Sequence, residues 1–389
     1  MPKEKIAIIS LLKPVDDIRS YQKIARSIGV KYPGEIHLIG YPSQTSHETE
    51  APYRFHPHPY FGRLSFGRLL VPIRVLWQLC RLKPKLIIVN SPELLLTTVL
   101  IKLCFGSKIW YDIQENYFYN LWHQQVYPPI IRHALAVLVR SKERLLAPFF
   151  DHYLLAEKCY KQELSYLRDR YTILENKTLP SAVVHKRPRK SDAPIRLLFS
   201  GTVTANTGIL QALRIAQSIA DSESIELHIV GHCSEEALYK ELQQHEAPWL
   251  QLNISKTPLP YYEIEHAIAQ ADVGIISYSI NPSNARCMPT KVYEYCARKL
   301  PILYESGCHW EAFIHDNGLG LGVDFNSPDP NAIRAFLHTA VTSTPPNQGA
   351  QKALWHTEEL KLMKLFEKEI NNKSTKQNAR HTGAYSSDR

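Results

Sequence analysis

The feature that most constrains this chain is a regular alternation: short apolar runs rich in β-branched residues are followed by segments of helical periodicity. Such alternation is typical of parallel α/β units, in which each strand leads into a helix that crosses back over the sheet. Two series of this kind are present, and a stretch rich in proline and basic residues separates them at 180–194. The sequence therefore predicts an α/β protein with two doubly wound, Rossmann-like sheets.

The two series predict the following strands and boundaries. Strands of the first sheet are expected at 6–10, 35–39, 86–90, 108–112, 152–156 and 171–175, and those of the second at 195–200, 226–230, 250–253, 272–277 and 301–304. The expected domains are an N-terminal domain at 1–180, a linker at 181–194, a C-terminal domain at 195–352, a helix at 353–371 packing across the domains and a flexible tail at 372–389. Because open α/β sheets bind ligands at the carboxyl ends of their strands, we expect a ligand in the cleft between the domains.

Length and composition agree with a globular, two-domain protein. A chain of 389 residues with 44% hydrophobic and 21% charged residues can bury two cores. Its apolar runs fall short of the roughly 18 to 20 residues that span a bilayer, and the run at 6–12 is interpreted as a first strand rather than an export signal. A cytoplasmic location with peripheral membrane contact at most is therefore expected. The net charge of +9 favours an anionic partner.

One candidate anion site lies at 195–208, where a strand is followed by a turn containing Gly201 and Thr202 and then by a helix from about Ile209. Such a turn presents backbone N–H groups and a helix N-terminus to an anion, and a nucleotide diphosphate would fit there. An ordinary β–α turn is the alternative.

A second candidate is the run at 287–304, in which Pro289 suits the first turn of a helix. Lys291 and Glu294, three residues apart, then share one helix face. A lysine there can attract phosphate, and a carboxylate can accept hydrogen bonds from the vicinal hydroxyls of a ribose. An exposed ion pair on a helix surface is the alternative.

The run Pro-Thr-Lys-x-Tyr-Glu-Tyr-x-Ala at 289–297, followed by a strand, resembles the donor-site signature of the retaining GT4-like glycosyltransferases of GT-B type. The resemblance covers nearly the whole chain, and it implies a hexosyltransferase-like enzyme with a donor in its C-terminal domain. In that family the glutamate holds the donor ribose, a role that falls here to Glu294. The lysine and the turn amides hold the diphosphate, a role that falls to Lys291, Gly201 and Thr202.

Other segments extend the resemblance and also depart from it. The stretch 254–260 is similar to the one that cradles the nucleobase, which points to Thr257 and Leu259. The Glu-x7-Glu pair of many members has Arg286 at its first position, and the family's Lys-Gly is Thr207-Gly208 here. Arg286 is therefore a candidate for the missing diphosphate cation.

The acceptor-side patterns of the family are Asp-x-Arg and Tyr-Asp-x-His-Glu, and the runs 16–19 and 110–116 resemble them. Gln114 stands where the family often has histidine, and an amide cannot carry a proton as imidazole does. The family implies that the departing diphosphate helps to deprotonate the acceptor. Asp112 and Glu115 are the candidate catalytic residues, with loop capping and salt bridging as their alternative role. No Asp-x-Asp pattern is placed to hold a divalent ion, so neither a metal nor another cofactor is expected.

Two segments interleave apolar and aromatic residues with arginine or lysine, at 53–81 and 130–150. Both could lie on anionic lipid, and packing of each against its own core is the alternative. Similar composition also suits single-stranded nucleic acid, but no RNP-like, KH or zinc motif is present, so no nucleic acid partner is expected.

The predicted function is transfer of a sugar from a nucleotide-sugar to a lipid-linked or cell-surface polysaccharide precursor at the cytoplasmic membrane face. A nucleotide-sugar epimerase of the same fold and a degenerate, non-catalytic transferase that binds a glycan or partner are the alternatives. A Rossmann dehydrogenase is less favoured, because no G-x-G-x-x-G follows either first strand.

Overall fold

The computed structural model describes residues 3–43, 51–61, 65, 67–123, 127–181, 193–318, 320–343 and 347–383. The chain divides into two compact units. Unit 1 comprises Met1–Asn176 together with His356–Arg389, and unit 2 comprises Lys177–Trp355. Most of the predicted linker, from 182 to 192, lies outside the described residues.

Unit 1 is built on a seven-stranded sheet whose pairings are all parallel, in the order β3-β2-β1-β4-β5-β6-β7. The strands are β1 (Lys5–Pro14), β2 (Glu35–Tyr41), β3 (Tyr53–Pro57), β4 (Leu86–Val89), β5 (Lys108–Ile113), β6 (His152–Leu155) and β7 (Tyr171–Ile173). The central strand β1 is apolar on both faces, and its residues 6–9 are buried, as expected for a strand covered on both sides.

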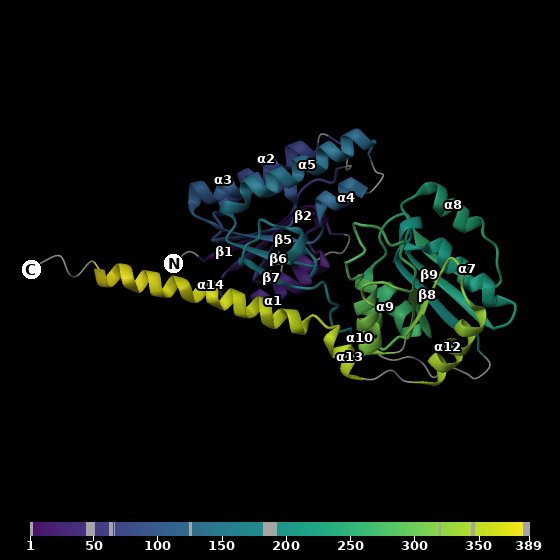
Figure 1. Ribbon diagram of the computed structural model, residues 1–389. Helices are drawn as coiled ribbons and strands as arrows, with labels where there is room; N and C mark the ends of the chain where they lie inside the picture. Colours follow the sequence, from purple (N-terminus) through teal and green to yellow (C-terminus); the bar gives the residue numbers. More distant parts are fainter. Residues whose placement is uncertain are drawn as a thin grey trace, which may run out of the picture. The chain divides into compact units, whose positions relative to one another are not determined.

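Helices cover both faces of this sheet. Their bounds are η1 (Ile18–Ala25), α1 (Arg26–Gly29), α2 (Gly67–Leu82), η2 (Pro92–Leu94), α3 (Leu95–Phe105), α4 (Tyr117–His123), α5 (Pro129–Leu146), η3 (Ala147–Phe149), α6 (Tyr160–Glu163) and α14 (His356–Gly383). Figure 1 shows α2, α3 and α5 together on one side of the sheet, with α1 and α14 on the other. Unit 1 is thus a three-layered, doubly wound domain.

Unit 2 has a six-stranded parallel sheet in the order β10-β9-β8-β11-β12-β13. Its strands are β8 (Ile195–Thr202), β9 (Ile225–His232), β10 (Leu250–Ser255), β11 (Val273–Ile276), β12 (Ile302–Glu305) and β13 (Gly320–Val323). Its helices are η4 (Ala205–Thr207), α7 (Ile209–Ala220), α8 (Glu236–Gln244), α9 (Tyr261–Gln270), α10 (Thr290–Ala297), α11 (Glu311–Asn317), α12 (Pro330–Thr342) and α13 (Asn347–Lys352). One core packs α7, α8 and α12 on the sheet, and the other packs α9, α10 and α11 on its opposite face.

The two predicted Rossmann-like domains are confirmed, and every predicted strand is present. Two further strands, β3 and β13, were not predicted, and both lie at a sheet edge. Within the predicted lipid-facing segment 53–81, Tyr53 and Phe55 therefore belong to the fold, since both pack edge-on against Tyr21, whereas Trp77 is exposed. Arg63 and Phe66 of that segment lie outside the described residues.

The C-terminal helix α14 joins unit 1, where Phe366 packs on Tyr32 and Trp110. It begins at His356 and continues to Gly383, beyond the predicted end at 371. The sequence 372–383 is polar, but it contains no proline that would end the helix. Flexibility of the tail stays a prediction, and 384–389 lie outside the described residues. None of the described helices is both long enough and apolar enough to cross a bilayer.

Candidate functional site

The strand order of unit 2 reverses beside β8, because β9 and β10 lie on one side of it and β11 to β13 on the other. Doubly wound sheets bind ligands in the crevice outside the carboxyl ends of the two strands at such a reversal. Here these strands are β8, ending at Thr202, and β11, ending at Ile276. The loops that follow them carry the turn around Gly201 and the approach to Lys291.

The turn after β8 is shaped by two glycines with positive φ, +87° at Gly201 and +84° at Gly208. Thr204 and Thr207 close it with a capping box, in which each backbone N–H donates to the other's hydroxyl at 3.0 and 3.2 Å. The Ser277 hydroxyl donates to the Gly208 carbonyl at 2.7 Å, and a Cβ at position 208 would lie 1.6 Å from the Ser277 carbonyl oxygen. The turn is therefore locked against the end of β11.

Lys291, in the first turn of α10, lies against this turn. A Cβ added at Gly201 would be 3.3 Å from the Lys291 Cε, and the amine lies 4.1 Å from the Phe199 ring centroid and 5.2 Å from that of Tyr278. The side chain is 4% exposed, and in the described part of the chain its Nζ has no hydrogen-bond partner. Burial lowers the pKa of Lys291 to about 7, against the opposing effect of Glu294. A buried cation that lacks hydrogen bonds is costly, and an anion would stabilise it.

Glu294 follows on the same helix and is half-buried. Burial first and the Glu294 charge second raise the pKa of Tyr261 and of Tyr278 to about 12. The carboxylate of Glu294 therefore lies near the start of α9, the end of β11 and Lys291. Gly201, Lys291 and Glu294, which the sequence placed about 90 residues apart, are brought together at the strand reversal.

The remaining predicted donor residues lie around this centre with more exposure. Thr202 is exposed, and its carbonyl accepts from the Thr207 hydroxyl at 2.9 Å. Arg286 is exposed in the loop between β11 and α10. Thr257 is exposed after β10, and its backbone N–H donates to Ser255 Oγ at 3.1 Å, whereas Leu259 is half-buried against the core.

In unit 1 the two acceptor-side patterns meet in a buried ion pair. Arg19 and Asp112 are each 2% exposed, and the Arg19 guanidinium donates to both Asp112 oxygens at 2.7 to 3.1 Å. Arg19 also donates to the Leu174 carbonyl at 2.8 Å, and Gln114 Nε2 donates to Asp112 Oδ2 at 2.7 Å. The Asp112 carboxylate is thus occupied by hydrogen bonds that fix the loop after β5.

Gln114 itself is held from several sides. Lys13 donates to its side-chain oxygen, and the Tyr160 hydroxyl donates to its backbone carbonyl at 3.3 Å. The following residue, Glu115, is exposed and accepts a hydrogen bond from Asn120 at 2.8 Å. Of the two candidate catalytic carboxylates, Glu115 is therefore the one at the surface.

Sequence reasoning missed the buried contacts that hold α10 in place. The Tyr295 hydroxyl and the Ser200 hydroxyl lie 2.9 Å apart in the core, and burial raises the pKa of Tyr295 well above its usual value. Gly274 leaves room for the Tyr295 ring, because a Cβ there would come within 2.4 Å of it. The alternation Tyr-Glu-Tyr at 293–295 was the available signal, since it places Glu294 between two core tyrosines.

Within the described residues, no three His, Cys, Asp or Glu side chains gather as metal ligands would. Metal independence of the chain stays a prediction.

No protein-family model matches the chain, and no curated protein sequence matches it. Solved structures do. Sucrose-phosphate synthase from Thermosynechococcus elongatus is 14% identical with a TM-score of 0.70, and the match covers 95% of this chain and 100% of that one. HepE of Anabaena in complex with UDP-glucose is 10% identical with a TM-score of 0.61, covering 94% and 100%. A glycosyltransferase from Rickettsia africae is 13% identical with a TM-score of 0.57, covering 94% of each chain. With its two parallel, doubly wound sheets, the chain has the GT-B fold of these glycosyltransferases.

Proposed function

We propose that this protein is a retaining glycosyltransferase that takes a nucleotide-sugar at the site formed by Gly201, Lys291 and Glu294. The observation that carries the proposal is the Lys291 amine, buried at the strand reversal without a hydrogen-bond partner among the described residues. A diphosphate placed on the turn amides would supply the missing acceptor and charge. HepE, which shares the fold, has crystal structures in complex with UDP-glucose and with UDP. A uridine nucleotide is therefore the first probe.

In this proposal the bond from the anomeric carbon to the diphosphate breaks, and the electron pair leaves with the nucleoside diphosphate. Lys291 and the turn amides stabilise the charge that develops there. The acceptor hydroxyl forms the new glycosidic bond and gives its proton to the departing diphosphate. Asp112 acts as a positioning residue, because Arg19 and Gln114 occupy its oxygens. Glu115 is the carboxylate that orients the acceptor, and Arg286 adds a cation to the diphosphate.

We further propose that the acceptor is a lipid-linked or cell-surface polysaccharide precursor, that the transfer needs no metal and that it takes place at the cytoplasmic membrane face. Thr257 and Leu259 would line the nucleobase region.

A thermal-shift panel of nucleotide-sugars tests the donor assignment. A ligand at about 100 times its Kd adds roughly 2.7 kcal/mol of apparent stability by mass action. Replacing Glu294 with alanine should weaken binding of the selected donor by about 1 to 3 kcal/mol, because it removes the hydrogen-bond acceptor for two buried ribose hydroxyls. Glu241→Ala, at an exposed position of α8, is the matched control. Unchanged affinity of Glu294→Ala would remove the ribose role.

Turnover assays separate the alternatives. Release of nucleotide only when acceptor is present supports transfer, and an epimerised nucleotide-sugar without acceptor supports the epimerase. Donor affinity without turnover on any acceptor would favour the non-catalytic alternative that Gln114 raises.

A further inference from the structure

The helix layer of α2, α3 and α5 exposes an unusual amount of apolar side chain. On α2 the exposed residues are Leu70, Ile73 and Trp77, at 57%, 63% and 60%. On α3 they are Leu96, Leu100 and Leu103, at 41 to 66%. Both sets follow helical spacing, so each forms a stripe along the outer side of its helix. We call this surface, together with the exposed apolar residues of α5, the docking face.

The third helix continues the same surface. Ile130, Val137, Leu138 and Leu145 of α5 are between 51% and 86% exposed. The helices α2 and α3 pack side by side, as do α3 and α5, so the stripes adjoin one another. The inner sides of α2 and α3 pack in the core, where residues such as Val75, Leu79 and Val99 are almost completely buried. A large exposed apolar patch of this kind marks a contact with a partner or a membrane.

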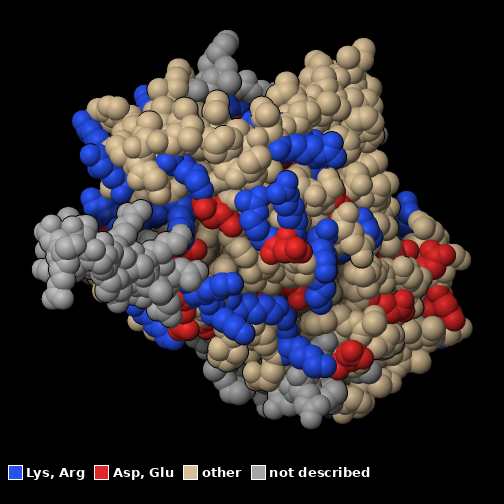
Figure 2. Space-filling view, turned by 60° about the vertical axis from the view of Figure 1, so that its left-hand side comes forward, with Lys and Arg blue, Asp and Glu red and all other residues tan. Residues whose placement is uncertain are grey.

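The charge of these helices selects the partner. Across α2, α3 and α5 the only acidic residue is Glu143, which is buried and accepts a hydrogen bond from Tyr111 at 2.8 Å. Arg74, Arg81 and Arg144 are exposed, and the Arg81 guanidinium lies 3.3 Å from the Trp77 ring centroid. In Figure 2 the upper surface, at the height of this layer in Figure 1, is largely free of charged side chains, and lysine and arginine gather below it.

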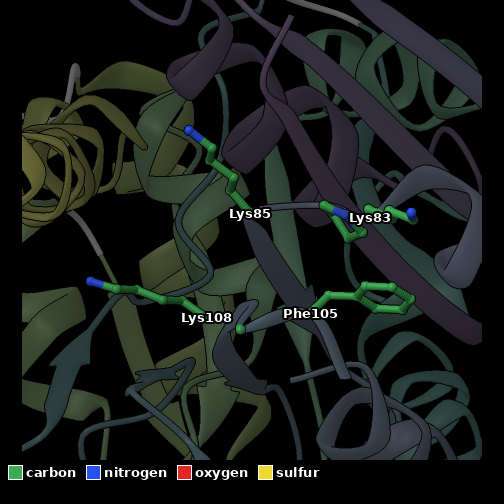
Figure 3. A pocket seen from close by; sticks show the side chains of 6 residues that line it. Lys83, Lys85, Phe105 and Lys108 are labelled. Carbon is green, nitrogen blue, oxygen red and sulfur yellow. The ribbon is translucent and has the colours of Figure 1, made fainter. Parts of the chain in front are cut away.

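A basic hollow lies at the end of the docking face. It measures about 370 Å³ and is lined by Lys83, Pro84, Lys85, Phe105, Gly106 and Lys108, where α2 and α3 end. Figure 3 shows Lys83 beside Phe105, with its amine 5.4 Å from the ring centroid, while the amines of Lys85 and Lys108 extend the other way. Lys85 pairs with Glu4, and Lys108 pairs with Glu369. Lys83 is therefore the lysine that borders the apolar surface.

We propose that the docking face binds an anionic lipid bilayer, with its apolar stripes in the headgroup boundary and its arginines on lipid phosphates. Apolar area flanked by basic residues is what peripheral membrane helices present. A second copy of the chain fits less well, because two such faces would oppose arginines without carboxylates to pair them. The carboxylates at its margins, Glu93 and Asp151, already pair with Arg68 and Lys102.

The same helix α5 reaches the loop of unit 1 that carries Glu115. Arg140 donates to Asn116 Oδ1 at 2.5 Å and lies 3.6 Å from Glu143. Docking would therefore hold this loop at the bilayer, where a lipid-linked acceptor is presented. This last step rests on the proposed function, whereas the binding of lipid does not.

Vesicle sedimentation of the full chain tests the proposal. We expect the protein to sediment with vesicles of equal phosphatidylcholine and phosphatidylglycerol, and much less with phosphatidylcholine alone. A triple variant with one change per helix, Ile73→Glu, Leu103→Glu and Leu138→Glu, should bind the mixed vesicles about 100-fold more weakly. The matched control is Val30→Glu, Tyr262→Glu and Leu360→Glu, three apolar side chains that are 59 to 79% exposed on other elements. Each single change Arg74→Ala, Arg81→Ala or Arg144→Ala should lower the affinity for the mixed vesicles about fivefold.

Unfolding midpoints and UDP affinity, measured without vesicles, show whether each variant is folded and whether the donor site works. Failure of UDP binding alone would contradict the proposed function and leave docking intact. The docking proposal is overturned if the wild type does not sediment with mixed vesicles, or if both triple variants bind alike. It is also overturned if the wild type forms a dimer that the docking-face variant abolishes while lipid binding persists.

Discussion

At the residue scale, the candidate site of unit 2 depends on the environment of one lysine. Lys291 is buried against two aromatic rings, and its pKa of about 7 means that the free protein carries this charge only in part near neutral pH. A bound diphosphate favours the ammonium form, so binding and protonation are linked. In the free protein the lowered pKa also links folding to pH. Between about pH 7 and 10.5 the unfolded chain keeps the Lys291 proton and the folded chain loses it, so the free energy of unfolding rises with pH.

We therefore expect UDP affinity to fall as pH rises through 7, approaching about tenfold per unit above pH 8. Calorimetric titration of UDP over this range measures it. In Lys291→Met the affinity should be lower and nearly independent of pH above neutrality. An equal pH slope in the variant would show that another group titrates.

Gly208 supplies a second test at this scale. Alanine at this position meets both an unfavourable φ and the carbonyl of Ser277, so the backbone must shift. Gly307 has a similar φ of +72°, but a Cβ there meets no atom within 4 Å. We expect Gly307→Ala to lower the free energy of unfolding by about 1 kcal/mol and Gly208→Ala by more than about 3 kcal/mol. Urea unfolding measures both, and equal losses would contradict the locked turn.

Only some of the contacts in the candidate sites could be predicted from the sequence. The proximity of Lys291 and Glu294 to Gly201 could be predicted, because the local helix pattern and the family resemblance both indicated a shared site. Salt bridging was the predicted alternative role of Asp112, but its partner Arg19 was not predicted. This pairing depends on the sheet order that brings the loop after β1 to the end of β5. The roles assigned to these residues in sugar transfer stay predictions.

At the scale of elements, the interior strands that sequence reasoning found are mostly buried and apolar. The two strands that it missed, β3 and β13, lie at sheet edges, as do the predicted strands β7 and β10. The strand β3 contains arginine, histidine and proline, and β13 alternates glycine with leucine and valine. An edge strand has one neighbour and needs less apolar surface, so its pattern is weak. The helix pattern at 353–371 was visible, but its place in unit 1 was not, because periodicity does not identify the surface that a helix covers.

The helix α14 is held to unit 1 by a few buried side chains, among them Leu362 at 0% and Phe366 at 2% exposure. We expect Phe366→Ala to lower the free energy of unfolding of unit 1 by about 3 to 5 kcal/mol, because it leaves a cavity beside Trp110. Leu360→Ala, at a position 60% exposed on the same helix, should cost less than about 0.5 kcal/mol. Denaturant unfolding followed by tryptophan fluorescence distinguishes them, and similar losses would mean that α14 is not packed as described.

At the scale of the whole molecule, the chain enters and leaves unit 2 at one place. Thr178 N–H donates to the Ala353 carbonyl at 3.1 Å, and Trp355 N–H donates to the Thr178 carbonyl at 2.7 Å. Unit 2 is thus inserted into unit 1, and it contains Gly201, Lys291 and Glu294. A fragment of residues 177–355 should therefore fold cooperatively and bind UDP within about tenfold of the full chain, which is 1.4 kcal/mol. A folded fragment without UDP affinity would mean that unit 1 supplies part of the donor site.

This insertion also has a consequence for biosynthesis. On the ribosome, all of unit 2 emerges before His356, so it can fold while unit 1 still lacks α14. Until α14 has emerged, the surface of unit 1 that Phe366 covers next to Tyr32 and Trp110 stays open to chaperones and to premature association. The helix that completes unit 1 is thus made only after the whole of unit 2.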